Sequence, residues 1–245
     1  TIPDYNFCSV SANVNIRQPL FSLSANILTT DVSCNGGNNG AVHTTVTGGT
    51  LPYTYLWNDS ITTQNRTALV AGTYIITITD AHGCHFTDSA PVNQPANPLS
   101  VTASVNNLSC YNNHSGSISL SVTGGTPGYT YYWSGGITTS GRTNLAAGTY
   151  HVTVKDANNC SVINNPVVTQ PAAPLAATTA VTNASCFGGN NGVVNLTVTG
   201  GTPGDKYSWN NGDSSQSINH QAAGNYTVTI TDANLCSASA SANVT

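Results

Sequence analysis

The stretch Thr-Gly-Gly-Thr-Leu-Pro-Tyr-Thr-Tyr-Leu-Trp at residues 47–57 decides the fold of this chain. Its paired glycines mark a turn, and Tyr53, Tyr55 and Trp57 then occupy alternate positions. Because successive side chains of a β-strand point to opposite faces, these three aromatic rings share one face. We therefore predict a turn followed by a short strand whose aromatic face fills a hydrophobic core.

The same stretch recurs with small changes at residues 123–133 and 199–209, which sets a repeat period of 76 residues. Self-similarity at a fixed period is the signature of a repeat architecture, so each repeat is expected to fold in the same way. Other residues recur in step: Cys34, Cys110 and Cys186; Cys84, Cys160 and Cys236; Gly72, Gly148 and Gly224; Tyr74, Tyr150 and Tyr226; Asp80, Asp156 and Asp232.

Short alternating segments surround the aromatic strand. Residues 99–105 and 117–122 alternate between apolar and polar side chains, and no segment shows a sustained helical period. We predict an all-β chain of tandem Ig-like β-sandwich repeats with the 76-residue period. The Gln-Pro-x-x-Pro linkers at residues 94–98 and 170–174 cannot continue a central strand. Such short, stiff joints predict an elongated rod.

The period also predicts the domain boundaries. Residues 20–97, 98–173 and 174–245 are expected to form the first, second and third Ig-like repeats. Residues 1–19 align with the end of a repeat, because Cys8 lies one period before Cys84. We expect this segment to be the orphan last strand of a preceding repeat.

The composition argues against several classes of function. Charged residues make up 6% of the chain and the net charge is −4, which argues against nucleic acid as a partner. The sequence contains no apolar run long enough to span a membrane as a helix, so membrane insertion is not expected. Seven cysteines at regular spacing, with no Cys-x-x-Cys pair, favour structural disulfides in an oxidising, extracellular location.

The repeat resembles that of SprB-type adhesins, which are large surface proteins of gliding bacteria. The resemblance rests on Ser-Cys-x-Gly-Gly-Asn-Asn-Gly (33–40 and 185–192), the aromatic stretch 47–57, Ala-Gly-Thr-Tyr (71–74) and Asp-Ala-x-x-Cys (80–84). It implies an Ig- or PKD-like sandwich, secretion through the type IX system, display on the cell surface, and an adhesive or stalk role. It also implies O-glycosylation at Asp-Ser followed by a small or apolar residue, which Ser60 and Ser89 fit.

The cysteines are predicted to form structural disulfides, with pairing inside each repeat favoured: Cys34 with Cys84, Cys110 with Cys160, and Cys186 with Cys236. Closing each loop of ~50 residues would stabilise a repeat by about 4 kcal/mol. In a standard Ig topology, however, the end of the first strand and the start of the last lie at opposite poles. The repeat must therefore deviate from that topology, or the cysteines bridge neighbouring repeats. Cys8 is left unpaired or intermolecular.

Other candidate sites favour structural interpretations. The aromatic row could bind sugars, but period-two aromatics more often fill a core, with Tyr132 as the surface-facing exception. Asp80 and its equivalents could hold calcium, but an aspartate before a short turn usually bonds its own backbone. His82 and His85 flank Cys84 without recurring in the other repeats, so a surface loop is favoured over a metal site.

No catalytic motif is found, so we expect no enzyme activity, no catalytic residue, no cofactor and no metal. The favoured function is a structural or adhesive extracellular repeat protein, the spacer or stalk of a large bacterial surface adhesin. The alternative is a subunit of an extracellular filament that polymerises by adding its N-terminal strand, around residues 4–14, to a neighbouring chain. The expected partners are neighbouring repeats or copies of the same chain, with surface glycans left open.

Overall fold

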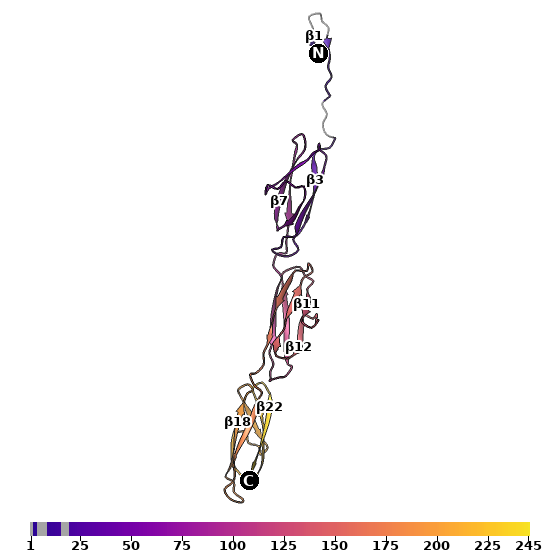
Figure 1. Ribbon diagram of the computed structural model, residues 1–245. Helices are drawn as coiled ribbons and strands as arrows, with labels where there is room; N and C mark the ends of the chain where they lie inside the picture. Colours follow the sequence, from indigo (N-terminus) through magenta and orange to yellow (C-terminus); the bar gives the residue numbers. More distant parts are fainter. Residues whose placement is uncertain (1, 4–8, 16–19) are drawn as a thin grey trace. The chain divides into compact units, whose positions relative to one another are not determined.

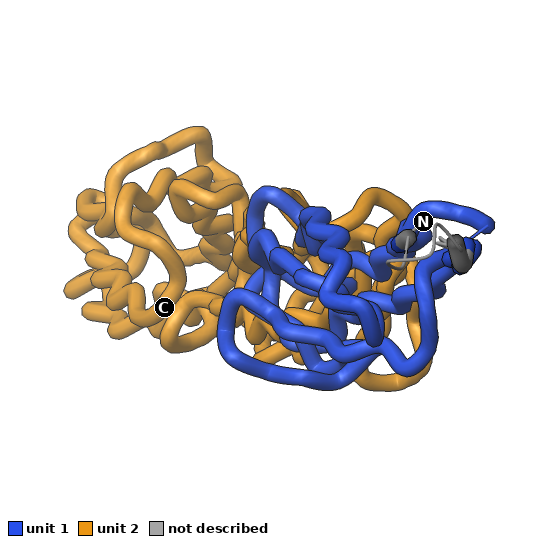
Figure 2. Tube along the Cα trace, turned by 90° about the horizontal axis from the view of Figure 1, so that it is seen from above, with its two compact units in different colours: residues 1–98 blue, residues 99–245 orange. Residues whose placement is uncertain are grey.

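A computed structural model describes residues 2–3, 9–15 and 20–245 of the chain. These residues form strands, turns and loops without any helix, as the ribbon in Figure 1 shows. The chain divides into two compact units, Thr1–Pro98 and Leu99–Thr245, coloured separately in Figure 2. The all-β prediction is confirmed.

The first unit contains one β-sandwich of two three-stranded sheets. One sheet has the order β3-β4-β6 and the other β5-β7-β8, with all neighbours antiparallel. The strands are β3 (Ser24–Thr30), β4 (Gly40–Thr47), β5 (Thr54–Trp57), β6 (Arg66–Leu69), β7 (Gly72–Thr79) and β8 (His85–Val92). In Ig notation these are A, B, C, E, F and G. The sheets A-B-E and C-F-G are those of an Ig constant-type sandwich without strand D.

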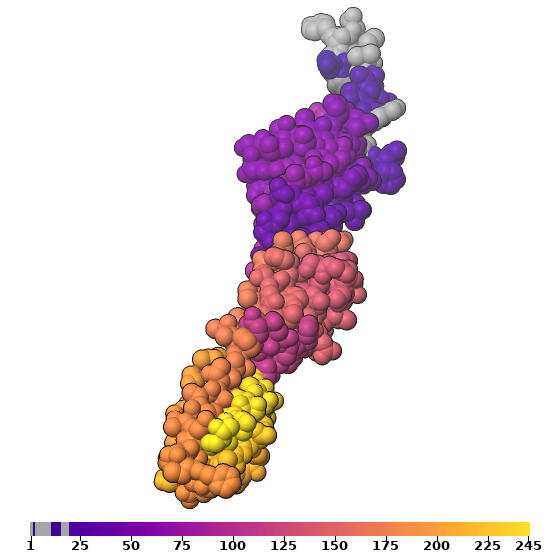
Figure 3. Space-filling view, turned by 60° about the horizontal axis from the view of Figure 1, so that its bottom comes forward, coloured from indigo at the N-terminus to yellow at the C-terminus, as the bar shows by residue number. Residues whose placement is uncertain are grey.

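The second unit contains two more sandwiches with the same strand order. The second repeat has sheets β9-β10-β12 and β11-β14-β15, and the third has β17-β18-β20 and β19-β21-β22. The strands of the second repeat are β9 (Ser100–Asn106), β10 (Gly116–Thr123), β11 (Thr130–Trp133), β12 (Gly141–Leu145), β14 (Val152–Lys155) and β15 (Ser161–Asn164). Those of the third are β17 (Ala176–Thr182), β18 (Gly192–Thr199), β19 (Lys206–Trp209), β20 (Ile218–Gln221), β21 (Gly224–Thr231) and β22 (Ser237–Val244). The C-terminal strand β22 reaches the surface of its sandwich (yellow in Figure 3).

Strands F and G of the second repeat are each interrupted. Short strands β13 (Gly148–Thr149) and β16 (Val167–Val168) pair separately from β14 and β15. Pro166 occupies the position of Ala90, which pairs with Tyr74 in the first repeat. Proline has no N–H, so the ladder retains only the bond from Tyr150 N to Pro166 O, at 2.9 Å.

Each sandwich encloses its own hydrophobic core around a tryptophan on strand C. Trp57, Trp133 and Trp209 are 1%, 3% and 3% exposed, and each indole N–H donates to a backbone carbonyl six residues later. Tyr53 and Tyr55 pack against the first core, so the predicted core role of this aromatic row is confirmed. A buried tryptophan on strand C is a hallmark of Ig-like sandwiches.

A tyrosine near the start of strand F anchors the E–F corner in every repeat. The hydroxyl of Tyr74 donates to Val70 O at 3.1 Å, that of Tyr150 to Ala146 O at 2.8 Å, and that of Tyr226 to Ala222 O at 3.0 Å. This bond to a backbone carbonyl just upstream is the tyrosine corner of Ig-like domains. The recurrence of Tyr74 was visible in the sequence, but its role depends on the strand order.

The N-terminal segment is described only in part. Strands β1 (Ile2–Pro3) and β2 (Ser9–Val10) pair antiparallel. Cys8 and much of the expected donor strand, residues 4–8, lie outside the described residues. Among the residues that the structure describes, no helix is long and apolar enough to cross a membrane. The domain boundaries and the rod shape stay predictions.

Candidate functional site

A buried aspartate at the end of strand F fixes one pole of each sandwich. Oδ1 of Asp156 accepts hydrogen bonds from the backbone N–H groups of Asn158 and Cys160, each at 2.9 Å. Its Oδ2 accepts one from Thr126 N, also at 2.9 Å. Since Thr126 belongs to the B–C loop, the carboxylate holds the F–G turn against that loop. Cys160 therefore lies at the pole where strand A begins and strand B ends.

This arrangement explains the paired glycines of the repeat. Gly125 has a φ of +60°, and a Cβ placed there would lie 2.6 Å from Oδ2 of Asp156. Only glycine lets the B–C loop approach the carboxylate this closely. The same contacts recur around Asp80 and Asp232.

The hydrogen bonds also lower the pKa of two of these carboxyl groups, those of Asp80 and Asp232. The backbone N–H of Cys84, followed by those of Thr50 and His82, lowers the pKa of Asp80 below its ordinary value, although burial acts in the opposite direction. For Asp232, burial raises the pKa, but the N–H groups that bond its carboxylate outweigh this effect and the net pKa is lowered. All three aspartates thus bond their own backbone, as the turn interpretation predicted.

The opposite pole carries the A–B loop, which binds the following linker. Oε1 of Gln94 accepts a hydrogen bond from Gly36 N at 2.8 Å, and Nδ2 of Asn35 donates to Pro95 O at 2.8 Å. In the second repeat Oε1 of Gln170 accepts from Asn112 N at 3.0 Å. Each Gln-Pro linker is therefore attached to the repeat that it leaves.

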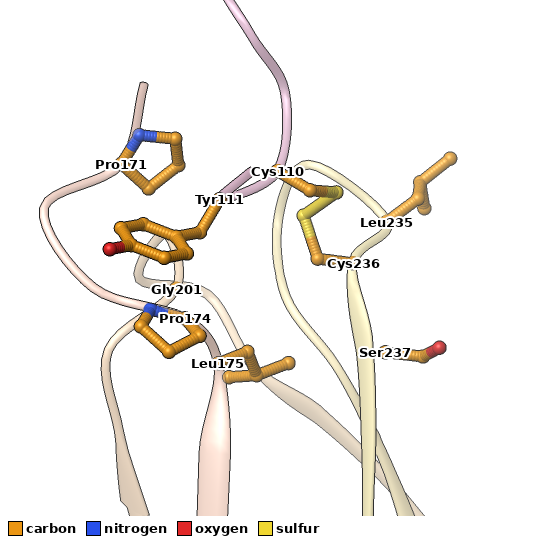
Figure 4. A pocket seen from close by; sticks show the side chains of 9 residues that line it. All are labelled: Cys110, Tyr111, Pro171, Pro174, Leu175, Gly201, Leu235, Cys236 and Ser237. Atoms are coloured by element: carbon orange, nitrogen blue, oxygen red, sulfur yellow. A yellow bond between two sulfur atoms is a disulfide. The ribbon is translucent and has the colours of Figure 1, made fainter. Parts of the chain in front are cut away.

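A disulfide in the second unit joins the A–B loop of one repeat to the F–G turn of the next. Cys110, in the A–B loop of the second repeat, is bonded to Cys236, at the F–G turn of the third, with their Cα atoms 5.7 Å apart. Figure 4 shows the bond beside the linker. Nδ2 of Asn234 also donates to Ser109 O at 3.1 Å, and Cys236 Sγ lies 3.4 Å from the same oxygen. The second and third repeats are joined by this disulfide and by the hydrogen bond from Asn234.

The pairing inside each repeat was wrong. Cys110 bonds Cys236, which removes the expected pairs with Cys160 and Cys186, and Cys84 is free, which removes the pair with Cys34. The A–B loop and the F–G turn lie at opposite poles of one sandwich, so these cysteines cannot meet without leaving the Ig topology. Cys110 and Cys236 meet instead at the junction of the second and third repeats, the alternative that the sequence left open.

The other cysteines fall into two groups. Cys34 and Cys160 are disulfide-bonded. Cys84 and Cys186, which were expected in disulfides, are free and exposed. Cys8, expected to be unpaired or intermolecular, lies outside the described residues.

A small pocket borders the disulfide of the second unit. Its lining comes from both repeats and the linker: Cys110, Tyr111, Pro171, Pro174, Leu175, Gly201, Leu235, Cys236 and Ser237. In Figure 4 the ring of Tyr111 lies between Pro171 and Pro174. The pocket holds a disulfide and an aromatic ring packed near prolines, an arrangement suited to joining repeats.

The remaining sequence candidates occupy the surface. Ser60 lies in the C–E loop and Ser89 on β8, both exposed, so either hydroxyl is accessible to a modifying enzyme. His82 and His85 are also exposed. No cluster of three or more metal-binding side chains occurs in the described part of the chain. Tyr132 is 50% exposed, as expected, with the Lys155 ammonium 5.6 Å from its ring centre.

The strand order, the buried tryptophan and the tyrosine corner define a tandem Ig-like repeat protein. The family profile described as SprB repeat matches residues 26–62, 102–138 and 178–214, one segment in each sandwich. The chain therefore contains three SprB repeats at a spacing of 76 residues, and the suspected resemblance is confirmed.

Solved structures with partial similarity include Ig-domain and surface-layer proteins. The N-terminal four Ig domains of Dscam1 isoform 8.4 are 14% identical with a TM-score of 0.30, covering 89% of this chain and 72% of that one. Extracellular domains 3–5 of Drosophila OTK are 12% identical with a TM-score of 0.30, covering 85% and 91%. Domains 4–9 of the surface layer protein SbsC are 14% identical with a TM-score of 0.27, covering 91% and 47%. No curated protein matches the sequence.

Proposed function

We propose that this chain is a non-enzymatic extracellular spacer, a stalk segment of a bacterial cell-surface adhesin. The observation that carries the proposal is the disulfide between Cys110 and Cys236, which joins successive repeats. A disulfide inside one domain stabilises only that domain. A disulfide between domains instead fixes their junction, which is what a spacer under tension needs.

The path of tension through the second unit supports this function. A pull that enters at Leu99 reaches Cys110 after strand A, and the covalent bond then passes it directly to Cys236. The remaining strands of the second repeat and the first five strands of the third lie inside the closed loop. The bond therefore lets the chain carry tension without extending the residues inside this loop.

The surface and the linkers fit the same function. Each linker glutamine is bonded to the loop of its own repeat, which restricts the joint. Scarce charge and many hydroxyl groups give a surface that suits an extracellular spacer, and O-glycosylation at Ser60 and Ser89 belongs to the proposal. Repeated disulfides imply an oxidising location outside the cytoplasm.

The filament alternative uses a different part of the chain. Its donor strand, around residues 4–14, lies partly outside the described residues, so strand addition stays a prediction. Both functions place the protein outside the cell but assign different tasks to the N-terminal segment.

Surface labelling tests the proposal. Antibody fragments raised against residues 99–245 should label intact source cells, and brief protease treatment of those cells should remove the label. Deleting residues 99–245 should shorten the distance from the cell surface to an epitope tag on the far side of the deletion. Labelling that appears only after lysis would contradict the proposal.

A further inference from the structure

The junction in the second unit shows how an A–B loop cysteine pairs. Cys110 bonds the F–G cysteine of the following repeat, 126 residues later. Cys84 holds the F–G position of the first repeat and Cys186 the A–B loop position of the third. Both are free and exposed. They are equivalent to the two halves of the observed bond.

A pocket around Cys84 matches the pocket at the observed junction. It is lined by Leu20, Phe21, Ser22, Leu23, Gly49, Asp80, Cys84 and His85. After a shift of two periods, Leu23, Gly49 and Cys84 correspond to Leu175, Gly201 and Cys236, which line the junction pocket. Among the described residues that line the Cys84 pocket, none supplies the half that Cys110 and Tyr111 supply at the junction. Leu20 and Phe21 at its rim are 94% and 76% exposed.

The loop around Cys186 supplies the missing half. Phe187 corresponds to Tyr111, which is 37% exposed at the junction, whereas Phe187 is fully exposed. The loop already has the shape that it has at the junction. Gly189 N donates to Cys186 O at 2.9 Å, as Asn113 N donates to Cys110 O at 3.3 Å. The exposed ring of Phe187 and the free thiol of Cys186 are therefore neighbours in the sequence, on a turn that is already formed.

We propose that the Cys186–Phe187 loop of one copy docks into the Cys84 pocket of a second copy and forms a disulfide there. The occupant is a second copy of this chain, because the chain carries both complementary halves of a junction that it already forms internally. The contact joins two different surfaces, so it leaves one half free at each end of the assembly. Such a heterologous contact forms an open chain of copies when its rotation does not close a ring.

The bond forms by thiol–disulfide exchange. The Cys84 and Cys186 thiols each lose a proton, and their sulfurs become joined as two electrons pass to an external disulfide. Oxidised glutathione is such an acceptor and leaves as two molecules of reduced glutathione. The inference rests on the proposed extracellular function only in that an oxidising location supplies the acceptor.

The hydrogen bond that Asn234 makes at the observed junction would be made by a different residue at the junction between two copies. His82 occupies the position of Asn234, whose side chain donates to Ser109 O. The equivalent acceptor in the incoming copy is the carbonyl of Ser185. An imidazole N–H can donate to a carbonyl as the amide does.

A complementation experiment tests this joint. Two full-length chains are made in a Cys8→Ser background, one with Cys84→Ser and one with Cys186→Ser. Each is incubated in a glutathione redox buffer, alone and as an isotope-labelled mixture. Each variant alone should stay monomeric, and the mixture should give heterodimers in which peptide mapping finds Cys84 bonded to Cys186. The parent with both cysteines should give a ladder in steps of 25.2 kDa.

Other outcomes would overturn the inference. Dimers of the Cys84→Ser chain alone would show unselective oxidation of an exposed thiol, and a mixture without heterodimers would show that the halves do not dock. Phe187→Ala in the parent should slow ladder formation several-fold, and an unchanged rate would contradict docking through the ring. None of these failures affects the internal bond of Cys110, so the spacer function is tested separately.

Discussion

Cys110 and Cys236 are bonded across 126 residues, from the A–B loop of one sandwich to the F–G turn of the next. The bond closes a loop that contains most of both domains. In the chain-entropy model, a loop of this length stabilises the folded state by about 5 kcal/mol. It also fixes how successive repeats are joined, because each sandwich presents its A–B loop at one pole and its F–G turn at the other.

The free cysteines should react with thiol reagents, and the disulfide-bonded cysteines should not. Alkylation of the native, oxidised chain is expected to modify Cys84 and Cys186 and to leave Cys110 and Cys236 unmodified. Proteolysis without reductant should then release a peptide pair that contains Cys110 and Cys236. Mass spectrometry provides both measurements. A linked pair of Cys110 with Cys160 would show that the pairing is internal to the repeat after all.

Thr44→Val should stabilise the first repeat by about 1–2 kcal/mol. Thr44 is fully buried and its hydroxyl has no hydrogen-bond partner, whereas the equivalent residues are Leu120 and Leu196. Valine keeps the shape and removes the unsatisfied group. Denaturant unfolding of the full chain, followed through the first repeat by hydrogen exchange, measures the change. Thr45→Val, on the exposed face of the same strand, is the matched control. A loss of stability in Thr44→Val alone would contradict the assignment.

Asp80→Asn should loosen the F–G turn of the first repeat in a pH-dependent way. Because the folded pKa of Asp80 is lowered, the carboxylate stabilises the fold at pH values above the ordinary pKa of about 3.9. This contribution is lost as the pH falls through the lower folded pKa. Hydrogen exchange of the Thr50 and Cys84 amides should therefore be faster in the variant at pH 7, and the difference should shrink in acid. Asp88→Asn, at an exposed position of β8, serves as the control. Equal exchange rates at pH 7 would contradict the role of Asp80.

Tyr150→Phe should destabilise the second repeat by about 1 kcal/mol, because it removes the bond from the hydroxyl to Ala146 O. The half-exposed Tyr132 provides the control as Tyr132→Phe, which should change stability less. Thermal unfolding monitored by hydrogen exchange in residues 146–154 separates the two variants. Equal effects would show that the corner bond is not the source of the loss.

Repetition in the sequence predicted much of the fold. The alternation of Tyr53, Tyr55 and Trp57 indicated which face is buried, because a period of two leaves few alternatives. The interruption in strands F and G was not predicted, since its cause is a single proline, Pro166, facing Tyr150. Its signal was the comparison of that position with Ala90 in the first repeat.

The disulfide pairing could not be derived in the same way. A period of 76 residues aligns the cysteines but does not say whether one repeat bonds itself or its neighbour. Pairing inside each repeat was favoured, for example between Cys110 and Cys160, whereas the poles of the Ig topology pointed to a neighbour. The topological constraint decides, because the two cysteines of one repeat lie at opposite ends of the sandwich.

The most direct test of the spacer function is the extension of the second unit under force. Handles are attached at residues 99 and 245 of the full chain, and the oxidised protein is compared with a Cys110→Ser, Cys236→Ser variant. The bond excludes 126 residues from extension, which at about 3.6 Å per residue corresponds to a contour length of about 45 nm. We expect the variant to extend farther by this amount and to show unfolding of the domains that the bond bypasses. Equal contour lengths in the two proteins would contradict the account.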